Sequence, residues 1–188
     1  MPHIVGQTIY LREYLTSDLE AINDWRKLDA IVWWTGVYIW PESLEQTKAF
    51  LEAQLNNSDP FNRKFAICRK DDDRYLGHIG YEHLDLGRRN TELGIVIGDP
   101  QSLSKGVGTE AIKLFLKICF DEMGLHRVGL RVMEYNDRGR RCYEKCGFKQ
   151  EGVLREYHHT RGRWHNQILM AILDHEYRAM IGAEGANT

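Results

Sequence analysis

The sequence predicts an α/β fold, a single domain on a mixed (α+β) sheet with elements in the order β-α-α-β-β-β-α-β-α-β-β. The 188 residues suit one domain with a sizeable core. Short runs with strand alternation are interleaved with longer runs of helical periodicity. No repeat, low-complexity stretch or Pro/Gly/Ser-rich linker divides the chain. We therefore expect one domain over residues 1–188, with its core at about 8–177 and a frayed tail at 182–188.

Local patterns justify each element in turn. "TIYLREY" alternates apolar and polar residues, as a half-buried strand does, and "WPESLEQTKAFLEAQL" enters a helix through proline and serine. "KFAICRK" and "YLGHIGYEHL" flank the polar turn "DDDR" and predict a hairpin. The predicted strands are 8–14, 64–70, 75–84, 91–99, 126–133, 152–159 and 166–173. The predicted helices are 16–28, 40–55, a helix from the glycine loop at 104–109 to Gly124, and 137–146.

The segment between the first two helices, "IVWWTGVYIW", is dense in aromatic residues. Two interpretations remain open for it. It is either material for the core and for helix packing, or one wall of a ligand pocket, which large rigid aromatic side chains build well.

Composition excludes several function classes. Hydrophobic residues make up 43% and charged residues 28%, with a net charge of −2, so no basic field points to nucleic acid. No apolar run reaches the ~18 residues of a membrane-spanning helix, and we expect no membrane partner. The first residues lack the basic-then-apolar pattern of a secretory signal. We therefore expect a cytoplasmic protein.

The four cysteines, Cys68, Cys119, Cys142 and Cys146, form no C-x-x-C pair. Cys142 and Cys146 are one helical turn apart and would suit a metal only if histidines converged on them. The eight histidines show no such spacing. We expect packing cysteines, reduced in the cytoplasm, and no metal.

The run "SLSKGVGTEA" places Gly106 and Gly108 at the start of a helix, where each glycine costs about 1 kcal/mol. One explanation is that backbone amides must approach an anion, since a helix N-terminus offers unpaired N–H groups. The other is a plain tight turn. "GVGTEA" also fits the dinucleotide fingerprint G-x-G-x-x-A, but the preceding strand ends eight or nine residues too early for it.

A second polar pattern lies in "EYNDRGRRCYEKCGF". Asn136, Arg140 and Tyr143 fall at i, i+4 and i+7 and would share one helix face, on which Gly139 leaves space. Such a stripe suits a groove for a ligand. A solvated basic helix with a half-buried tyrosine is the alternative.

Together the two patterns resemble the GNAT superfamily of acyl-CoA-dependent N-acetyltransferases. "ELGIVIGDP", "KGVGTEA", "LHRVGLRV" and "NDRGRRCYEKCGF" carry the resemblance, which runs from about Thr8 to Tyr177. It is closest to the branch with the ribosomal-protein-alanine N-acetyltransferases. The resemblance implies a sheet whose central strands splay apart to admit the pantetheine arm of acetyl-CoA.

The resemblance also implies roles for individual residues. Two positions in the glycine loop depart from the family pattern: Leu103 offers no polar side chain to phosphate, and Ser104 suits a positive φ less well than glycine. Tyr143 would lie beside the thioester sulfur. The residues implied for acetyl-CoA are Ile95, Val96 and Ile97 at the pantetheine and thioester, Lys105, Gly106, Val107, Gly108 and Thr109 at the pyrophosphate, and Asn136 with Arg140 along the cofactor arm.

For the chemistry we expect direct transfer in a ternary complex with a primary amine. Glu92 is the candidate base, with Glu82 or an ordered water in reserve, and Tyr143 is the candidate acid for the leaving thiolate. The acceptor stays open among a protein N-terminus, a polyamine, an amino acid and an antibiotic amine. A non-catalytic acyl-CoA-binding module and a dinucleotide-dependent oxidoreductase are the alternative functions. The oligomeric state is open as well, with a homodimer among the arrangements considered.

Overall fold

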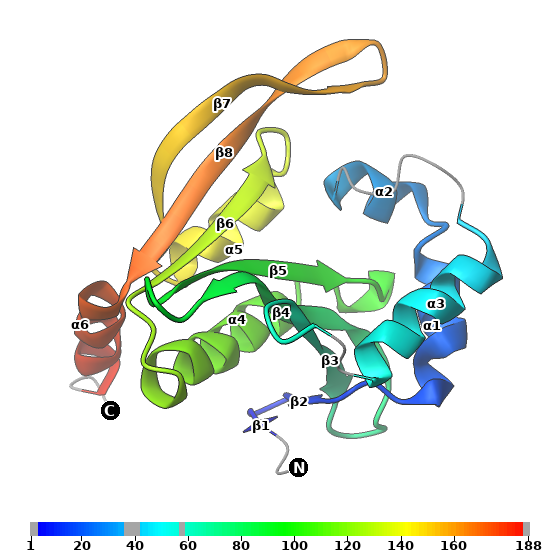
Figure 1. Cartoon of the computed structure of the whole chain (residues 1–188), viewed down its shortest axis with the longest axis horizontal. Helices are drawn as coiled ribbons and strands as arrows, with labels where there is room; N and C mark the ends of the chain where they lie inside the picture. The colour runs from blue at the N-terminus through cyan, green and yellow to red at the C-terminus, as the bar shows by residue number, and fades with distance from the viewer. Residues whose placement is uncertain (1–3, 36–41, 57–58, 186–188) are drawn as a thin grey trace.

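A computed structural model of the chain describes residues 4–35, 42–56 and 59–185. Within them eight strands form one sheet in the order β1-β2-β3-β4-β5-β6-β8-β7 (Figure 1). Neighbouring strands are antiparallel except β5 and β6, which are parallel. The strands are β1 Ile4–Val5, β2 Ile9–Arg12, β3 Arg63–Arg69, β4 Tyr75–Asp85, β5 Asn90–Ile97, β6 Arg127–Met133, β7 Lys149–Thr160 and β8 Arg163–Leu173.

The structure contains the four predicted helices and two more. The additions are α2, inside the aromatic segment, and α6, which follows the last strand. Because α6 continues through Gly185, residues 182–185 are helical, where we expected a frayed tail. The helices are α1 Leu19–Trp25, α2 Asp29–Thr35, α3 Leu44–Leu55, α4 Val107–Lys117 with a π-helical turn at Ile118–Glu122, α5 Asp137–Lys145 and α6 Asp174–Gly185.

Helices pack on the two faces of the sheet and produce two cores. α4 buries Ala111, Ile112, Phe115 and Leu116 in the larger core. Each fully buried Leu or Phe stabilises the fold by about 1.5–3 kcal/mol, which outweighs the cost of the two glycines at the start of the helix. In the smaller core, α1 and α3 pack with β3 and the start of β4. The central elements therefore form a rigid frame.

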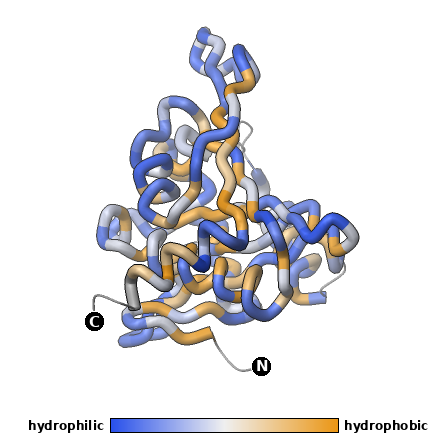
Figure 2. The backbone as a smooth tube through the Cα atoms, turned by 90° about the vertical axis from the view of Figure 1, so that its left-hand side faces the viewer, coloured by the Kyte–Doolittle hydropathy of each residue, from blue (hydrophilic) through white to orange (hydrophobic). Residues whose placement is uncertain are grey.

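β7 and β8 form a long hairpin that projects beyond the rest of the sheet (Figure 1). The turn at its end is mostly hydrophilic (Figure 2). None of the helices in the described part of the chain is long and apolar enough to cross a membrane. The single parallel strand pair also argues against the dinucleotide fingerprint, which requires a parallel βαβ frame in a doubly wound sheet.

Candidate functional site

The two parallel strands separate within the sheet. β5 and β6 pair only at Asn90–Arg127, Thr91–Val128 and Glu92–Gly129, although β5 continues to Ile97 and β6 to Met133. β4 still pairs with β5, and β8 with β6, along these lengths. One edge of β5 is therefore unpaired after Glu92, and its backbone N–H and C=O groups are available to a ligand. The expected splay of the central strands is confirmed.

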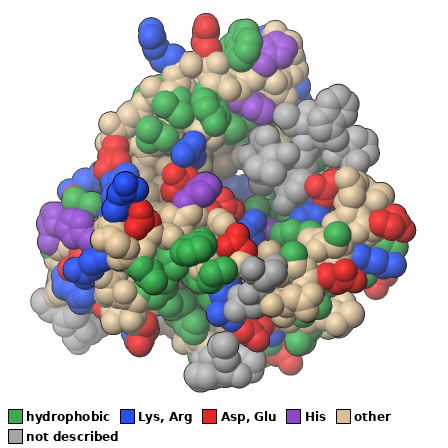
Figure 3. All heavy atoms as spheres, in the orientation of Figure 1, with side chains coloured by type: hydrophobic (Ala, Val, Ile, Leu, Met, Phe, Trp, Pro, Cys, Tyr) green, Lys and Arg blue, Asp and Glu red, His purple; other side chains and the backbone are tan. Residues whose placement is uncertain are grey.

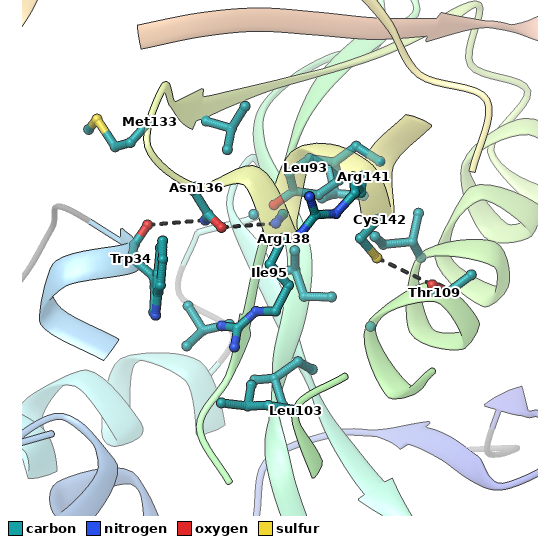
Figure 4. A pocket seen from close by; sticks show the side chains of 18 of the residues that line it. Trp34, Leu93, Ile95, Leu103, Thr109, Met133, Asn136, Arg138, Arg141 and Cys142 are labelled. Carbon is teal, nitrogen blue, oxygen red and sulfur yellow. Dashed lines mark hydrogen bonds between the residues drawn. The ribbon is translucent and has the colours of Figure 1, made fainter. Parts of the chain in front are cut away.

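A pocket of about 650 Å³ occupies this gap. It extends from the start of α4, at Gly106 and Gly108, along Ile95, Val96 and Ile97 to the two carboxylates Glu82 and Glu92. Figure 3 shows a hollow near the centre of this face, with acidic and basic side chains around it. The residues labelled in Figure 4 come from α2, from the two separating strands, from α4 and the loop before it, and from α5 and its N-cap.

The first end of the pocket is the N-terminus of α4. The first helical hydrogen bond of α4 runs from Glu110 N to Gly106 O, at 2.9 Å. The amides of Val107, Gly108 and Thr109 come before it and therefore have no acceptor within the helix. Gly106 has φ of 87°, and a Cβ built on it would meet no protein atom within 4 Å. The site thus combines free N–H donors with open space, as an anion requires.

The residues predicted to bind the pyrophosphate differ in where their side chains lie relative to the pocket. Gly106, Gly108 and Thr109 line the pocket, whereas the side chain of Val107 is buried in the larger core. The side chain of Lys105 is exposed and does not line the pocket. Val107 can therefore contribute only its backbone amide.

The two residues that depart from the family pattern both line the pocket. Ser104 has φ of 60°, in the left-handed region that favours glycine, so the concern about this position is confirmed. Leu103 presents an apolar side chain, as the sequence requires (Figure 4). The loop therefore keeps its amides but carries one strained residue.

Asn136 caps α5 instead of belonging to its face. Its Oδ1 accepts a hydrogen bond from Gly139 N at 2.9 Å, and its Nδ2 donates to Trp34 O at 3.3 Å (Figure 4). Both ends of the amide therefore already have protein partners. The Arg138 guanidinium also lies over the Trp34 ring, 5.4 Å from its centre. These contacts fix Trp34 as a wall of the pocket, which supports the pocket interpretation for the described part of the aromatic segment.

The predicted stripe on α5 was partly wrong. Arg140 does not line the pocket and pairs with Asp137 at 3.6 Å. Asn136, Gly139 and Tyr143 line the pocket as predicted, together with Arg138, Arg141, Cys142 and Lys145. Arg140 N bonds to Asn136 O at 3.0 Å, as in a regular first turn, but the Arg140 side chain pairs with Asp137, one turn earlier on α5.

Tyr143 and Cys142 lie together where α5 meets α4. Burial raises the pKa of the Tyr143 hydroxyl, and the neighbouring Cys142 and Cys146 raise it further. A hydrogen bond from Cys146 lowers the pKa of the Cys142 thiol, with help from the Thr109 hydroxyl at 3.3 Å. Tyr143 therefore remains a protonated donor, while Cys142 favours its thiolate.

The opposite end of the pocket holds the two candidate bases. Glu82 and Glu92 are directly opposite in the β4–β5 register, so their side chains share one face of the sheet. Arg131 binds both oxygens of Glu92, at 3.0 and 3.1 Å, and Lys64 lies 3.2 Å from Glu82. The structure brings both carboxylates to the pocket, and each has a cationic partner.

His78 is a pocket residue that the sequence reasoning missed. It is buried on β4, and its Nδ1 shares a hydrogen bond with the Tyr75 hydroxyl at 3.4 Å. Burial lowers the pKa of His78 well below its usual value, and the charges of Lys64 and Arg26 lower it further. His78 therefore lines the pocket as a neutral imidazole. The signal that could have identified it is a titratable side chain among the apolar residues of the predicted strand "YLGHIGYEHL".

These features fit acetyl-CoA. Free amides and open space suit its pyrophosphate, and the unpaired edge of β5 suits the amides of its pantetheine arm. Among the described residues, no group of three or more His, Cys, Asp or Glu side chains could hold a metal ion.

Comparisons with known proteins agree with this geometry. The acetyltransferase (GNAT) domain family matches residues 8–149. The chain is 26% identical to the N-acetyltransferase YnaD of Bacillus subtilis over 175 residues, which cover 93% of this chain and 99% of the relative. It is 30% identical to the spermidine N(1)-acetyltransferase of Escherichia coli over 121 residues, 64% of this chain and 63% of the relative.

The fold has a close counterpart among solved structures. The spermidine N-acetyltransferase of Vibrio cholerae, solved with CoA and spermine, superposes with a TM-score of 0.82 at 24% identity, covering 92% of this chain and 99% of that one. The family match spans most of the chain, and the separated strands and the helix N-terminus are those that the sequence predicted. The chain belongs to the GNAT family of acetyltransferases.

Proposed function

We propose that this enzyme transfers an acetyl group directly to a primary amine in a ternary complex, with the α-amine of a peptide as the preferred acceptor. The observation that supports the proposal most strongly is the separation of β5 from β6 after Glu92, because it joins an anion site, a tyrosine and two carboxylates in one pocket. The resemblance to the ribosomal-protein-alanine N-acetyltransferases favours a peptide acceptor. The spermidine acetyltransferases among the relatives favour a polyamine as the second candidate.

Acetyl-CoA supplies an acetyl group that is activated as a thioester. The amides at the start of α4 bind its pyrophosphate, and backbone groups of Ile95, Val96 and Ile97 hold the arm that carries the thioester. An N–H group near Val96 or Ile97 donates to the acyl oxygen, and one such donor is worth about 3–4 kcal/mol in the transition state. Asn136 caps α5 and so keeps Tyr143 in position.

Tyr143 acts at the thiol end of the pocket. The raised pKa keeps its hydroxyl protonated at neutral pH, so it is a hydrogen-bond donor to the departing sulfur. Proton transfer from tyrosine to a thiolate of pKa about 8.5 is uphill even from the ordinary pKa of about 10. Tyr143 therefore stabilises the leaving group mainly through a hydrogen bond that shortens as negative charge develops.

A general base contributes less to the acetylation of an α-amine than to that of a lysine-like amine. An amine with pKa near 10.4 is only about 0.1% neutral at pH 7.4, whereas an α-amine near 7.7–8.0 is tens of per cent neutral. Glu92 faces the acceptor end and receives the proton, directly or through water. Arg131 donates a hydrogen bond to each oxygen of the Glu92 carboxylate, so the proton of the amine is accepted by a lone pair that does not face Arg131.

An acceptor screen tests the proposal. Free CoA and acetylated product would be measured with peptides beginning with Ser or Ala, with spermidine and with simple amines. We expect acetylated peptide in a 1:1 ratio to released CoA, and a much slower reaction with the Tyr143→Phe protein. CoA release without any acetylated amine would contradict the proposal. So would activity that is confined to O-acetylation.

A further inference from the structure

The acceptor end of the pocket contains two acidic side chains, both on the same face of the sheet. Glu82 and Glu92 face each other across β4 and β5, and the next pair on the same face of the sheet is Gly80 opposite Gly94. Neither glycine carries a side chain, and a Cβ on Gly80 would meet the backbone of Arg63 and Lys64, so β3 fills the space there. Glu82 Oε1 lies 3.1 Å from the place that a Cβ on Gly94 would occupy. Two bare carboxylates here would form a strong site for a polycation.

The carboxylates, however, are already neutralised. The Arg131 guanidinium binds Glu92 through two nitrogens, and the Lys64 ammonium binds Glu82. All four side chains line the pocket; those of Lys64, Glu82 and Glu92 are half-buried, and that of Arg131 is exposed. Their formal charges sum to zero, so this end of the pocket presents no net attraction to additional positive charge.

The two histidines near the carboxylates add no negative charge. His78 is neutral, because its pKa lies well below its usual value. His83 lies 3.9 Å from Glu92 and, when protonated, adds positive charge.

We propose that this site selects acceptors with a single amine over polyamines, and that Lys64 and Arg131 are the residues that set this specificity. The proposal rests on the proposed acetyl transfer to an amine. Each extra ammonium of a polyamine loses hydration on entering the pocket and regains stabilisation only beside an unpaired carboxylate. A monoamine needs no such partner. The two ion pairs therefore act against polyamines by leaving them without a counterion.

The test uses three amines of one chemical type: n-butylamine, putrescine (1,4-diaminobutane) and spermidine. Putrescine is butylamine with a second ammonium, so the ratio of their kcat/KM values isolates the effect of that charge. For the wild-type enzyme we expect a putrescine-to-butylamine ratio within about threefold of one, which includes the statistical factor of two. Lys64→Gln with Arg131→Gln should raise the ratio at least tenfold by uncovering Glu82 and Glu92.

Two further variants separate this effect from general damage. Arg131→Lys keeps the charge and should retain the wild-type ratio. Arg69→Gln removes an arginine that also binds a carboxylate through two nitrogens, Asp72 at 2.7 and 2.8 Å, but outside the pocket. It changes the net charge of the protein by the same amount as Arg131→Gln and should leave the ratio unchanged.

Binding provides a readout that is independent of turnover. Calorimetry in the presence of CoA should show spermidine binding at least tenfold more tightly to the double variant than to the wild type, whereas butylamine binds both equally. The inference is overturned if wild-type enzyme prefers putrescine or spermidine over butylamine by tenfold or more. It is also overturned if uncovering the carboxylates leaves both the ratio and spermidine affinity unchanged. Failure of every amine to be acetylated would count against the proposed function, and the spermidine titrations would still decide the inference.

Discussion

Tyr143 carries the clearest residue-scale prediction. Tyr143→Phe keeps the ring that packs edge-on against Phe148, 6.0 Å between centres, and removes only the hydroxyl. Acetyl-CoA affinity should therefore be retained while kcat falls by on the order of 10²-fold or more, the typical loss when one hydrogen-bond donor to developing negative charge is removed. Calorimetry and steady-state kinetics on the same preparation measure the two effects. A variant with wild-type kcat would show that the thiolate leaves without help from this hydroxyl.

Glu92 is tested through the pH dependence of the reaction. If it receives the proton of the amine, Glu92→Gln should lower kcat/KM most at low pH, where neutral amine is scarce, and recover partly towards pH 9.5. The loss should be larger for a lysine-like acceptor than for an α-amine, because more of the latter is already neutral. The measurement is kcat/KM from about pH 6 to 9.5 for both proteins. An unchanged profile would move the search to Glu82, and a uniform loss would assign Glu92 to acceptor positioning.

Cys142 should react differently from the other cysteines. Its pKa is lowered, so its thiolate persists at a lower pH than that of an ordinary thiol near pKa 8.5. Burial raises the pKa of Cys68 to about 11 and that of Cys119 to about 12, and both side chains are fully buried. Iodoacetamide should therefore add a single carbamidomethyl group, on Cys142, with a half-maximal rate below pH 8.5.

Acetyl-CoA provides the control for this labelling, because Cys142 lines the pocket that we assign to it. Saturating acetyl-CoA should slow the alkylation, and Cys142→Ser should abolish it. Labelling at the same rate with and without acetyl-CoA would place the cofactor arm elsewhere.

At the scale of elements, the start of α4 is the main binding feature. Gly106→Val should weaken acetyl-CoA binding, because it places a branched side chain in open space above free amides and forces φ of 87° on a residue that disfavours it. Gly162 is a matched control, since it has φ of 75°, also has no neighbour within 4 Å of a built Cβ, and lies in the β7–β8 turn. Gly162→Val should have a similar strain cost but unchanged affinity. Equal affinity losses in the two variants would contradict an anion site at Gly106.

Much of the fold was predictable from the sequence because its signals are local. Strand alternation, the Ser43 cap with its Gln46 partner and the glycines before α4 each depend on residues a few positions apart. α6 was missed because "DHEYRAMIGAEG" continues from a strand with no turn signal between them. Its start is fixed by contacts that the sequence does not display, such as the hydrogen bond from the Tyr177 hydroxyl to Asp121 at 3.2 Å.

The site was predictable only in outline. Tyr143, Glu92 and the glycine loop lie at the pocket as the sequence indicated, because each belongs to a recognisable motif. Arg131 and Lys64 were not identified, since their roles arise from cross-strand contacts between distant segments. Trp34 belongs to the aromatic segment for which a pocket wall was one of two interpretations, and its contacts with α5 are not visible in the sequence. Arg140 was placed wrongly because its side chain pairs with Asp137.

At the scale of the whole molecule, the pocket connects two distinct ends through the gap between β5 and β6. The end at α4 suits an anion, and the end at Glu82 and Glu92 suits an amine. In the proposed ternary complex both ends are occupied at once, and the acetyl group passes directly from one ligand to the other. Among the described pocket residues, Cys142 is the nucleophile whose lowered pKa best suits a different route, through an acetylated enzyme.

The measurement that tests direct transfer most sharply is the initial rate as a function of both acetyl-CoA and acceptor concentration. A ternary complex predicts double-reciprocal lines that intersect, no release of CoA before acceptor is added, and retained turnover in Cys142→Ala. Parallel lines, together with a stoichiometric burst of CoA from enzyme and acetyl-CoA alone, are the signature of an acetylated enzyme. That result, with its loss in Cys142→Ala, would contradict direct transfer.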